Sequence, residues 1–269
     1  SVETDNFLSP TSVDKVLKYL YQFGDNCTCI AGGTWIMRSK IRRQKVPDVF
    51  ISLQNIKELK HIEVNSNRIV FGAMCSHFEI ADKLKNIKEL SAVYTAANKS
   101  ANPAVRRMAT IGGNICSKFF ESSDLLPALI ACDATVNIQT LTDRFNMPIL
   151  EFFYHREKVS TPHVLCKVLI PRGKFFTSHQ RVLIRNAGEY PIANLSVKLT
   201  EENKIIKKIQ LVVGSVEEKA KNWSSLESEL KDRELEPNKI QELSKSLIDY
   251  FSGRDSVDAP GWYRKRVLS

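Results

Sequence analysis

The stretch Thr110-Ile111-Gly112-Gly113-Asn114 is the segment around which we take the rest of the chain to be organised. Glycine costs backbone conformational entropy, so two adjacent glycines indicate a positive φ, a tight turn or a ligand lying against bare backbone. A second stretch, Ile30-Ala31-Gly32-Gly33-Thr34-Trp35, has the same short apolar run, glycine pair and small hydroxyl residue. Two such loops could face each other across one phosphate-bearing ligand, because backbone N–H groups lined up in a turn form an anion-binding nest.

A purely structural turn is the alternative for each glycine pair. Neither pair matches the common nucleotide fingerprints, since the sequence has no G-x-G-x-x-G after a strand and no G-x-x-x-x-G-K-[ST]. The residues alone therefore leave two interpretations open, a pair of structural turns and a backbone site for a phosphate.

The composition is that of an ordinary globular protein, with 269 residues of which 43% are hydrophobic and 26% are charged. The formal net charge of +9 at pH 7 predicts a basic surface, which suits nucleic acids, anionic cofactors or acidic partner proteins without choosing among them. Aromatic residues do not alternate with the basic ones, and no nucleic-acid-binding motif is present. We therefore expect no nucleic-acid partner.

The cysteines predict free thiols rather than a metal site. The sequence has six of them and no C-x-x-C spacing, and scattered single cysteines in apolar surroundings are typical of buried thiols in a reducing compartment. An iron–sulfur cluster or another metal on this chain would need paired ligand spacings. No apolar run is long enough to span a membrane, and the first residues are unlike a signal peptide, so we expect a cytoplasmic protein with no membrane partner.

Apolar spacing and capping residues predict the secondary structure. They predict helices at residues 13–20, 77–84, 90–101, 125–130, 226–230 and 240–251, with a further helix beginning at residue 35. They predict strands at residues 27–31, 49–53, 134–140 and 165–170, a hairpin of 62–64 with 68–73, and an antiparallel pair of 193–200 with 205–213. The basic run over 38–45 suits either a solvated face or a dock for an acidic partner.

The two glycine stretches resemble the two FAD-binding loops of the flavoprotein (medium) subunit of the molybdenum hydroxylases, the xanthine dehydrogenase, aldehyde oxidase and carbon monoxide dehydrogenase family. Further segments are similar to that family in order and spacing, and the resemblance covers essentially the whole chain. They are Arg106 before the second stretch, Pro47-Asp48-Val49-Phe50-Ile51-Ser52-Leu53, Ser123-Asp124-Leu125-Leu126-Pro127-Ala128-Leu129 and Tyr263-Arg264-Lys265-Arg266.

The resemblance implies an α+β fold in three parts. Two α/β subdomains, residues 1–57 and 58–172, would form an FAD-binding domain of the PCMH (vanillyl-alcohol-oxidase-like) type. Residues 173–269 would form a C-terminal α+β subdomain with an antiparallel sheet and helices, like the C-terminal part of the carbon monoxide dehydrogenase flavoprotein.

The resemblance also implies which residues bind the cofactor. The FAD pyrophosphate would lie between the two glycine stretches, where bare backbone can approach phosphate oxygens and hydroxyls can donate. The residues carried over for this role are Ile30, Ala31, Gly32, Gly33, Thr34, Trp35, Thr110, Ile111, Gly112, Gly113 and Asn114.

Five further residues would complete the implied cofactor site. Asp124 would hydrogen-bond the ribose or pyrophosphate end of FAD, with Ser123 beside it, and Asp or Ser can at the same time cap the following helix. Arg106 would supply positive charge, Tyr190 would lie against the isoalloxazine, and Leu165 would line the pocket.

Some residues depart from the family pattern or carry no predicted chemistry. The family's Arg-Asn is Arg106-Arg107 here, and Trp35 stands where the family has a small residue. Phe119-Phe120 follow the second stretch, where smaller residues are usual. Trp35 and the two phenylalanines put the access of an electron acceptor in doubt more than they do FAD binding. The five histidines have no ligand spacing and no serine-nucleophile motif beside them, so we expect structural or surface roles.

The resemblance implies an oxidoreductase that is one subunit of a complex. A molybdopterin-binding large subunit would hydroxylate the substrate, and a [2Fe-2S] small subunit would pass electrons to FAD on this chain and then to an acceptor such as NAD. Because the flavin carries the redox chemistry, no catalytic acid or base is expected here. The alternatives are a non-catalytic FAD- or nucleotide-binding accessory protein that has lost its partners, and a basic RNA-binding protein.

Overall fold

A computed structural model describes residues 6–31, 47–99, 103–116, 123–155, 161–183, 191–256 and 259–269. The described residues form two compact units, each assembled from separate parts of the sequence. The first unit takes its residues from 1–80, 103–118 and 133–171, and the second from 81–102, 119–132 and 172–269. Our division into three subdomains, with breaks near residues 57 and 172, stays a prediction.

A parallel sheet of three strands opens the first unit, in the order β1-β3-β2. The strands are β1 (Phe7–Leu8), β2 (Cys27–Ile30) and β3 (Val49–Ser52). Strands β2 and β3 confirm the two strands predicted here, and β2 ends directly before Ala31. The parallel pairing of Ile30 with Ser52 therefore fixes where the first glycine stretch leaves the sheet.

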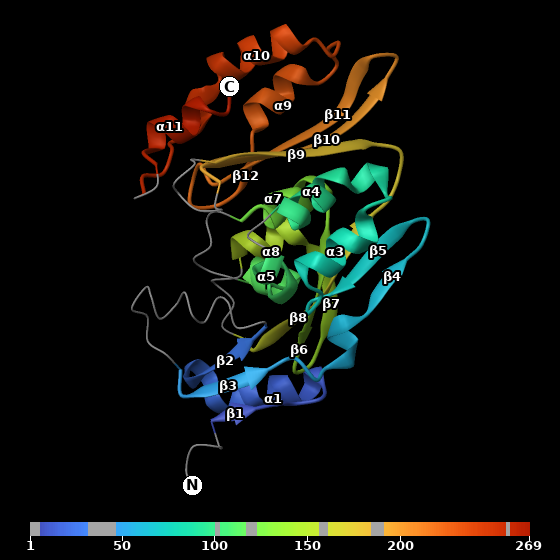
Figure 1. Ribbon diagram of the computed structural model, residues 1–269, viewed down its shortest axis with the longest axis vertical. Coiled ribbons are helices and arrows are strands. Elements are labelled where there is room, and N and C mark those ends of the chain that lie inside the picture. Colours follow the sequence, from blue (N-terminus) through green and yellow to red (C-terminus); the bar gives the residue numbers. More distant parts are fainter. Residues whose placement is uncertain are drawn as a thin grey trace. The chain divides into compact units, whose positions relative to one another are not determined.

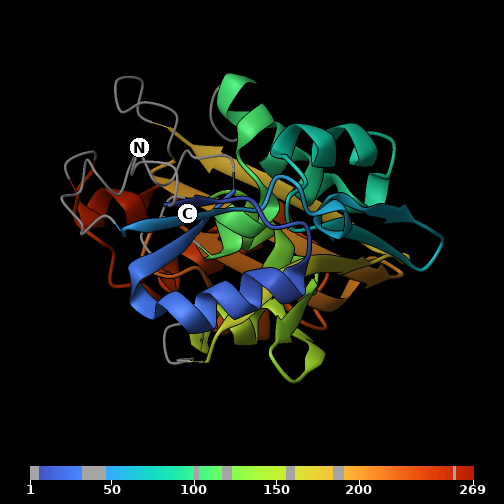
Figure 2. The same ribbon diagram turned by 90° about the horizontal axis from the view of Figure 1, so that it is seen from below.

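Helix α1 (Val13–Phe23) confirms the predicted helix and continues three residues beyond it. The hydroxyl of Ser12 caps it by accepting a hydrogen bond of 3.2 Å from the N–H of Lys15. Its apolar side packs against β2 and against a strand of the second sheet of this unit, β8 (His163–Pro171), and Figure 2 shows the helix in blue in front of the sheets. The helix thus joins the two sheets of the first unit.

The second sheet of the first unit is antiparallel throughout, in the order β4-β5-β8-β6-β7. Its strands are β4 (Ile62–Val64), β5 (Arg68–Gly72), β6 (Thr135–Thr140), β7 (Arg144–Pro148) and the longer β8. The predicted hairpin and both predicted strands are confirmed, whereas β7 was not predicted. Consecutive residues of β5, β6 and β8 are buried, so this sheet is the core of the unit.

Short helices surround this sheet and connect its strands. Those of the first unit are η2 (Lys57–Lys60), α5 (Pro103–Met108), α6 (Ile111–Cys116) and α8 (Ile149–His155). Helix α3 (His77–Leu84) runs from the first unit into the second and confirms the predicted helix behind Ser76. Ser76 and Glu79 form a reciprocal capping box, in which each side chain accepts a hydrogen bond of 3.1 Å from the backbone N–H of the other.

The second unit is a four-stranded antiparallel sheet covered by helices on both faces (Figure 1). The strands, in the order β12-β11-β10-β9, are β9 (Phe176–Val182), β10 (Ala193–Glu202), β11 (Ile205–Gly214) and β12 (Lys221–Asn222). The helices are α4 (Ser91–Lys99), α7 (Leu125–Ala131), α9 (Ser224–Leu230), α10 (Pro237–Ser246) and α11 (Gly261–Arg266). A 3-10 turn, η5 (Ile248–Tyr250), follows α10 where a single longer helix was predicted.

Alternation along β10 separates the two faces of this sheet. Leu195 and Val197 pack against the apolar cluster that contains Trp223 and residues of α9. The intervening Asn194 and Ser196 are buried on the face that α4 and α7 cover. The predicted pairing of β10 with β11 is confirmed. Asn194 and Ser196, two buried polar residues of β10, lie on the face of the sheet that α7 covers.

No helix in the part of the chain that the structure describes is both long enough and apolar enough to span a membrane.

We predict that Ser76→Ala lowers the free energy of unfolding by about 1 kcal/mol, because the first turn of α3 loses its capping hydroxyl. Urea denaturation followed by circular dichroism measures the change. Ser66→Ala, in the exposed turn of the β4–β5 hairpin, is the matched control and should change stability by less than about 0.5 kcal/mol. Equal values for the two variants would contradict the capping role.

Candidate functional site

The second glycine stretch forms a helix, and our prediction of a loop there was wrong. Residues Ile111–Cys116 form α6, which is bonded at its start to the chain that follows β5. The N–H of Ile111 donates to the carbonyl of Cys75 at 2.9 Å, and Thr110 forms an isolated antiparallel bridge with Ser76. Tertiary hydrogen bonds thus hold two glycines in a conformation that their own propensity disfavours.

Gly112 is required by packing against Ala73. Its N–H donates to the carbonyl oxygen of Ala73 at 2.8 Å. A methyl carbon at position 112 would lie 2.9 Å from the Cβ of Ala73 and 2.9 Å from that same carbonyl oxygen. A side chain at position 112 would therefore meet the protein itself.

Gly113 brings the two glycine stretches together. A methyl carbon at this position would lie 3.8 Å from the carbonyl oxygen of Ala31 and 3.9 Å from its Cβ. The two stretches that we expected to face each other therefore lie side by side at Ala31 and Gly113. Of the other residues in the first stretch, Ile30 ends β2, and Gly32, Gly33, Thr34 and Trp35 lie outside the described residues.

The backbone N–H groups of α6 are already used within the protein. Gly113 donates to the hydroxyl oxygen of Thr110 at 3.0 Å, and Asn114 donates to the carbonyl of Thr110 at 3.0 Å. Because the Thr110 oxygen accepts, its hydrogen can be directed elsewhere. The hydroxyl of Thr110 is therefore a described donor group beside Gly113.

The remaining predicted residues of the first unit are placed as follows. Arg106 lies half-buried in the last turn of α5, and Asn114 is buried in α6. Leu165 is buried in β8, where it pairs with Ile138. Arg107, the departure from the family pattern, lies with its guanidinium 4.4 Å from the ring centroid of Phe78.

Ser123 and Asp124 belong to the second unit, and of these two residues it is Ser123 that caps the helix. The hydroxyl of Ser123 accepts a hydrogen bond of 3.2 Å from the N–H of Leu126 and so caps α7. The side chain of Asp124 makes no capping bond. One oxygen of its carboxylate instead lies 2.8 Å from Nε2 of His179 and the other 3.0 Å from Nη2 of Arg181, both on β9.

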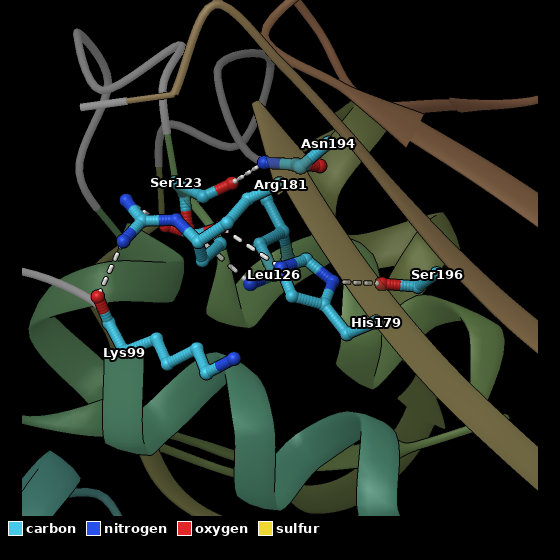
Figure 3. A network of polar contacts seen from close by, with 8 residues as sticks. Lys99, Ser123, Leu126, His179, Arg181, Asn194 and Ser196 are labelled. Atoms are coloured by element: carbon cyan, nitrogen blue, oxygen red, sulfur yellow. Dashed lines mark hydrogen bonds and ion pairs between the residues drawn. The ribbon is translucent and has the colours of Figure 1, made fainter. Parts of the chain in front are cut away.

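A buried polar network surrounds this carboxylate. Nδ1 of His179 lies 2.7 Å from Oγ of Ser196, and the amide of Asn194 donates to the carbonyl of Ser123 at 3.0 Å (Figure 3). Asp124 and His179 are each 3% exposed and Ser196 is fully buried. The order serine, histidine, aspartate matches a hydrolase triad, but a nucleophile sealed in this way cannot reach a substrate, so the network is not a hydrolytic site.

His179 is a functional candidate that sequence reasoning missed. We had assigned all five histidines structural or surface roles, and the sequence offers no signal here because His179 and Asp124 are 55 residues apart. Tyr190, together with Phe119 and Phe120, lies outside the described residues, as does the whole basic run over 38–45.

The six cysteines are free thiols, and Cys75, Cys132 and Cys166 are buried as predicted, whereas Cys27 and Cys29 are partly buried and Cys116 at the end of α6 is exposed. Burial, followed by the neighbouring Cys27 and Cys116, raises the pKa of Cys29 to about 12. Burial also raises the pKa of Cys75 to about 12. These two thiols next to the glycine stretches are therefore protonated at neutral pH and poor nucleophiles.

A cavity in the first unit lies away from these residues. Its lining comes from η2, β5, β7 and β8, and includes Lys57, Arg144 and Lys167. None of the residues predicted to bind the cofactor lines it. The predicted site is thus supported by the Ala31–Gly113 contact and not by this cavity.

Two family models match consecutive parts of the chain. Residues 3–173 match the FAD binding domain in molybdopterin dehydrogenase. Residues 178–269 match the CO dehydrogenase flavoprotein C-terminal domain.

Curated relatives align over nearly the full chain. The glyceraldehyde dehydrogenase medium chain of Sulfolobus acidocaldarius is 21% identical over 98% of this chain and 94% of its own length. The nicotine 6-hydroxylase medium subunit of Paenarthrobacter nicotinovorans is 24% identical over 97% of this chain and 92% of its own.

Solved structures share the fold. A chain of carbon monoxide dehydrogenase from Hydrogenophaga pseudoflava superposes with a TM-score of 0.88 at 20% identity, over 97% of this chain and 92% of that chain. Quinoline 2-oxidoreductase from Pseudomonas putida 86 gives a TM-score of 0.86 at 18% identity, over 97% and 91%. The mixed helix-and-sheet fold that we predicted from the sequence is therefore confirmed.

We predict that an alanine substitution lowers stability more at Gly112 than at Gly113, the two glycines of α6. Gly112→Ala should lower the free energy of unfolding by about 1–3 kcal/mol, because the backbone of Ala73 must move. Gly113→Ala should change it by less than about 1 kcal/mol, because its nearest neighbour, the Thr110 side chain, can rotate and alanine favours a helix. Denaturant unfolding measures both, and a larger loss at position 113 would contradict the packing described.

Proposed function

The chain belongs to the family of the FAD binding domain in molybdopterin dehydrogenase, an oxidoreductase family with FAD as the cofactor of this chain, and we propose that it transfers electrons within a molybdenum hydroxylase complex. Electrons would arrive from a [2Fe-2S] subunit, pass through FAD held by this chain, and leave to an acceptor such as NAD. A molybdopterin-binding large subunit would carry out the hydroxylation.

The contact between Ala31 and Gly113 is the observation that carries this proposal. Two sequence stretches about eighty residues apart meet at two small residues, Ala31 and Gly113, with the Thr110 side chain beside them. A flat or extended ligand can approach the backbone of both segments closely at such a junction. We infer that the FAD pyrophosphate lies here.

The donor chemistry of the first unit fits an anionic cofactor. Thr110 has a hydroxyl hydrogen to give, and Arg106 brings a permanent positive charge on the neighbouring helix α5. Because the amides of Gly112 and Gly113 are bonded within the protein, we assign binding in the described part of the site to side chains rather than to a nest of amides. We therefore no longer expect the backbone amides of Gly112 and Gly113 to bind the pyrophosphate.

The chain's own contribution is to hold the cofactor and set its surroundings. When bound, FAD supplies the redox chemistry, since it accepts and releases electrons itself. The thiols of Cys29 and Cys75 stay protonated at neutral pH and so do not compete as nucleophiles near the glycine stretches. We accordingly assign no residue of this chain a role in proton transfer to substrate.

The partner subunits are proposed from the relatives. Two of the aligned relatives are named as a medium chain and a medium subunit, so each is one part of a larger assembly. The net charge of +9 suits an anionic cofactor and acidic partner surfaces. We propose one molybdopterin-binding and one [2Fe-2S] partner.

We predict that the purified full-length chain is yellow, or becomes so on addition of FAD, and that the chromophore released on denaturation is FAD. Gly113→Ala should weaken FAD retention by about tenfold, since the methyl group occupies space beside Ala31. Gly173→Ala, in the turn between β8 and β9, is the matched control and should bind FAD like the original chain. A visible spectrum and a fluorescence titration measure this. A folded, colourless chain that takes up no FAD would contradict the proposal.

We predict that NADH reduces the FAD-loaded chain in the absence of oxygen, because an acceptor that takes electrons from a flavin can return them. Loss of the visible flavin absorbance follows the reaction, and dithionite serves as the control that the flavin is reducible. Bleaching by dithionite but not by NADH would show that NAD is not the acceptor.

A further inference from the structure

The cavity of the first unit is lined by η2 and by the antiparallel sheet, and it has a volume of about 380 Å³. Its lining residues come from η2, from β5, β7 and β8, and from His61 directly after η2, and all of them belong to that unit. The volume is at the lower end of the range found for small-molecule sites. The cavity is therefore large enough for a small ligand, and none of the residues that we assign to FAD lines it.

The pairing of the strands brings Lys167 to this cavity. Lys167 of β8 pairs with Gly72 of β5 on one side and with Asn137 of β6 on the other. Directly paired residues of an antiparallel sheet have their side chains on the same face. A Cβ on Gly72 would overlap the carbonyl group of Leu59, which places η2 on that face. The side chain of Lys167 therefore leaves the sheet on the face that carries η2.

Lys167 is an exception within its strand. Residues 164–166 and 168–170 of β8 are buried, whereas Lys167 is partly exposed. A lysine is rarely found in such surroundings without a partner for its charge. Its ammonium group makes no hydrogen bond or ion pair with the residues that the structure describes. The strand thus places a charged group without a protein partner in the lining of the cavity.

Positive charge exceeds negative charge around the cavity. Lys57 and Arg144 line it together with Lys167, and among the lining residues Glu58 supplies the carboxylate. That carboxylate lies 3.4 Å from Nη2 of Arg144, whose Nε donates to Oδ1 of Asn137 at 3.0 Å. The ammonium group of Lys57 makes no hydrogen bond or ion pair within the described part of the chain. The carboxylate of Glu58 therefore offsets the charge of Arg144 and leaves those of the two lysines.

The buried thiol beside the cavity adds no negative charge. Cys166 belongs to the lining and is 2% exposed, and burial raises the pKa of its thiol to about 11. The positive charges of Arg144 and Lys167 act against this rise without cancelling it. The thiol is therefore protonated at neutral pH, and the two ammonium groups are not neutralised by a thiolate.

Ammonium groups beside a guanidinium suit a compact anion. Each ammonium is a point charge with three donors, and a phosphate group has several oxygens that can accept from more than one cation. We propose that this cavity binds the phosphate group of a small molecule, with Lys57, Arg144 and Lys167 as the donors. The site goes beyond the proposed function and does not depend on it, because its residues are separate from those assigned to FAD.

The experiment is a ³¹P NMR titration of the full chain with inorganic phosphate and, separately, with adenosine 5′-monophosphate. Saturating FAD is present, so that neither ligand binds at the cofactor site. Binding should be saturable and should weaken as NaCl is added, because salt screens the attraction. Equal affinities would show that the phosphate group alone is recognised. Tighter binding of the monophosphate would identify an organic phosphate whose remaining part also occupies the cavity.

Four variants test the assignment of the donors. Lys167→Met should weaken binding by about tenfold, the effect expected from one hydrogen bond between charged groups. Lys57→Gln should weaken it by about threefold, because this lysine is exposed. Lys60→Gln is the matched control, since it removes the same charge from η2 outside the lining, and it should change the affinity by less than about 1.5-fold. Glu58→Gln should tighten binding by about threefold, because it removes a negative charge that faces the anion.

Equal losses in the Lys57 and Lys60 variants would overturn the proposal, because they would show that phosphate binds to the basic surface in general. An absence of saturable binding, or a Lys167→Met chain that binds like the original, would overturn it as well. Circular dichroism shows whether Lys167→Met is folded, and if it is not, the comparison of Lys57→Gln with Lys60→Gln decides. A chain that binds no FAD is titrated without it, so failure of the proposed function leaves this test in place.

Discussion

The contact between Gly112 and Ala73 is the constraint on which the geometry of the glycine stretches depends. The N–H of Gly112 donates to the carbonyl of Ala73 at 2.8 Å, and no side chain fits between them. Ala73 is in turn anchored to the sheet, because its own N–H donates to the carbonyl of Cys166 in β8 at 2.9 Å. The core sheet therefore sets the position of α6, and α6 turns Gly113 toward Ala31.

Local sequence signals sufficed wherever a local interaction decides the structure. Ser12 caps α1 and Ser76 caps α3 as their spacing predicts, and the hairpin of β4 with β5 follows from alternation around a polar turn. The same reasoning failed at Gly112 and Gly113. Each glycine costs roughly 1 kcal/mol in a helix interior, so the sequence favours a loop, and only the tertiary bonds to Ala73 and Cys75 make the helix preferable.

The candidate site was predictable to the extent that its residues form contiguous motifs. The two matching stretches led us to expect that they face each other across a phosphate-bearing ligand; in the structure they lie close together at Ala31 and Gly113, and the ligand between them stays a prediction. For Asp124 the sequence left capping and cofactor binding open, and the cap belongs to Ser123. The contacts of His179 and Arg181 with Asp124 could not be predicted, because they join residues of β9 to the start of α7, and only the folded second unit brings these distant segments together.

The most direct test of the account is a crystal structure of the chain loaded with FAD. The account predicts the pyrophosphate beside Ala31 and Gly113, within hydrogen-bonding distance of the Thr110 hydroxyl, with α6 still bonded to Ala73. FAD bound elsewhere on the chain, with the Ala31–Gly113 junction covered only by protein, would contradict it and leave the two glycine stretches as packing features of the fold.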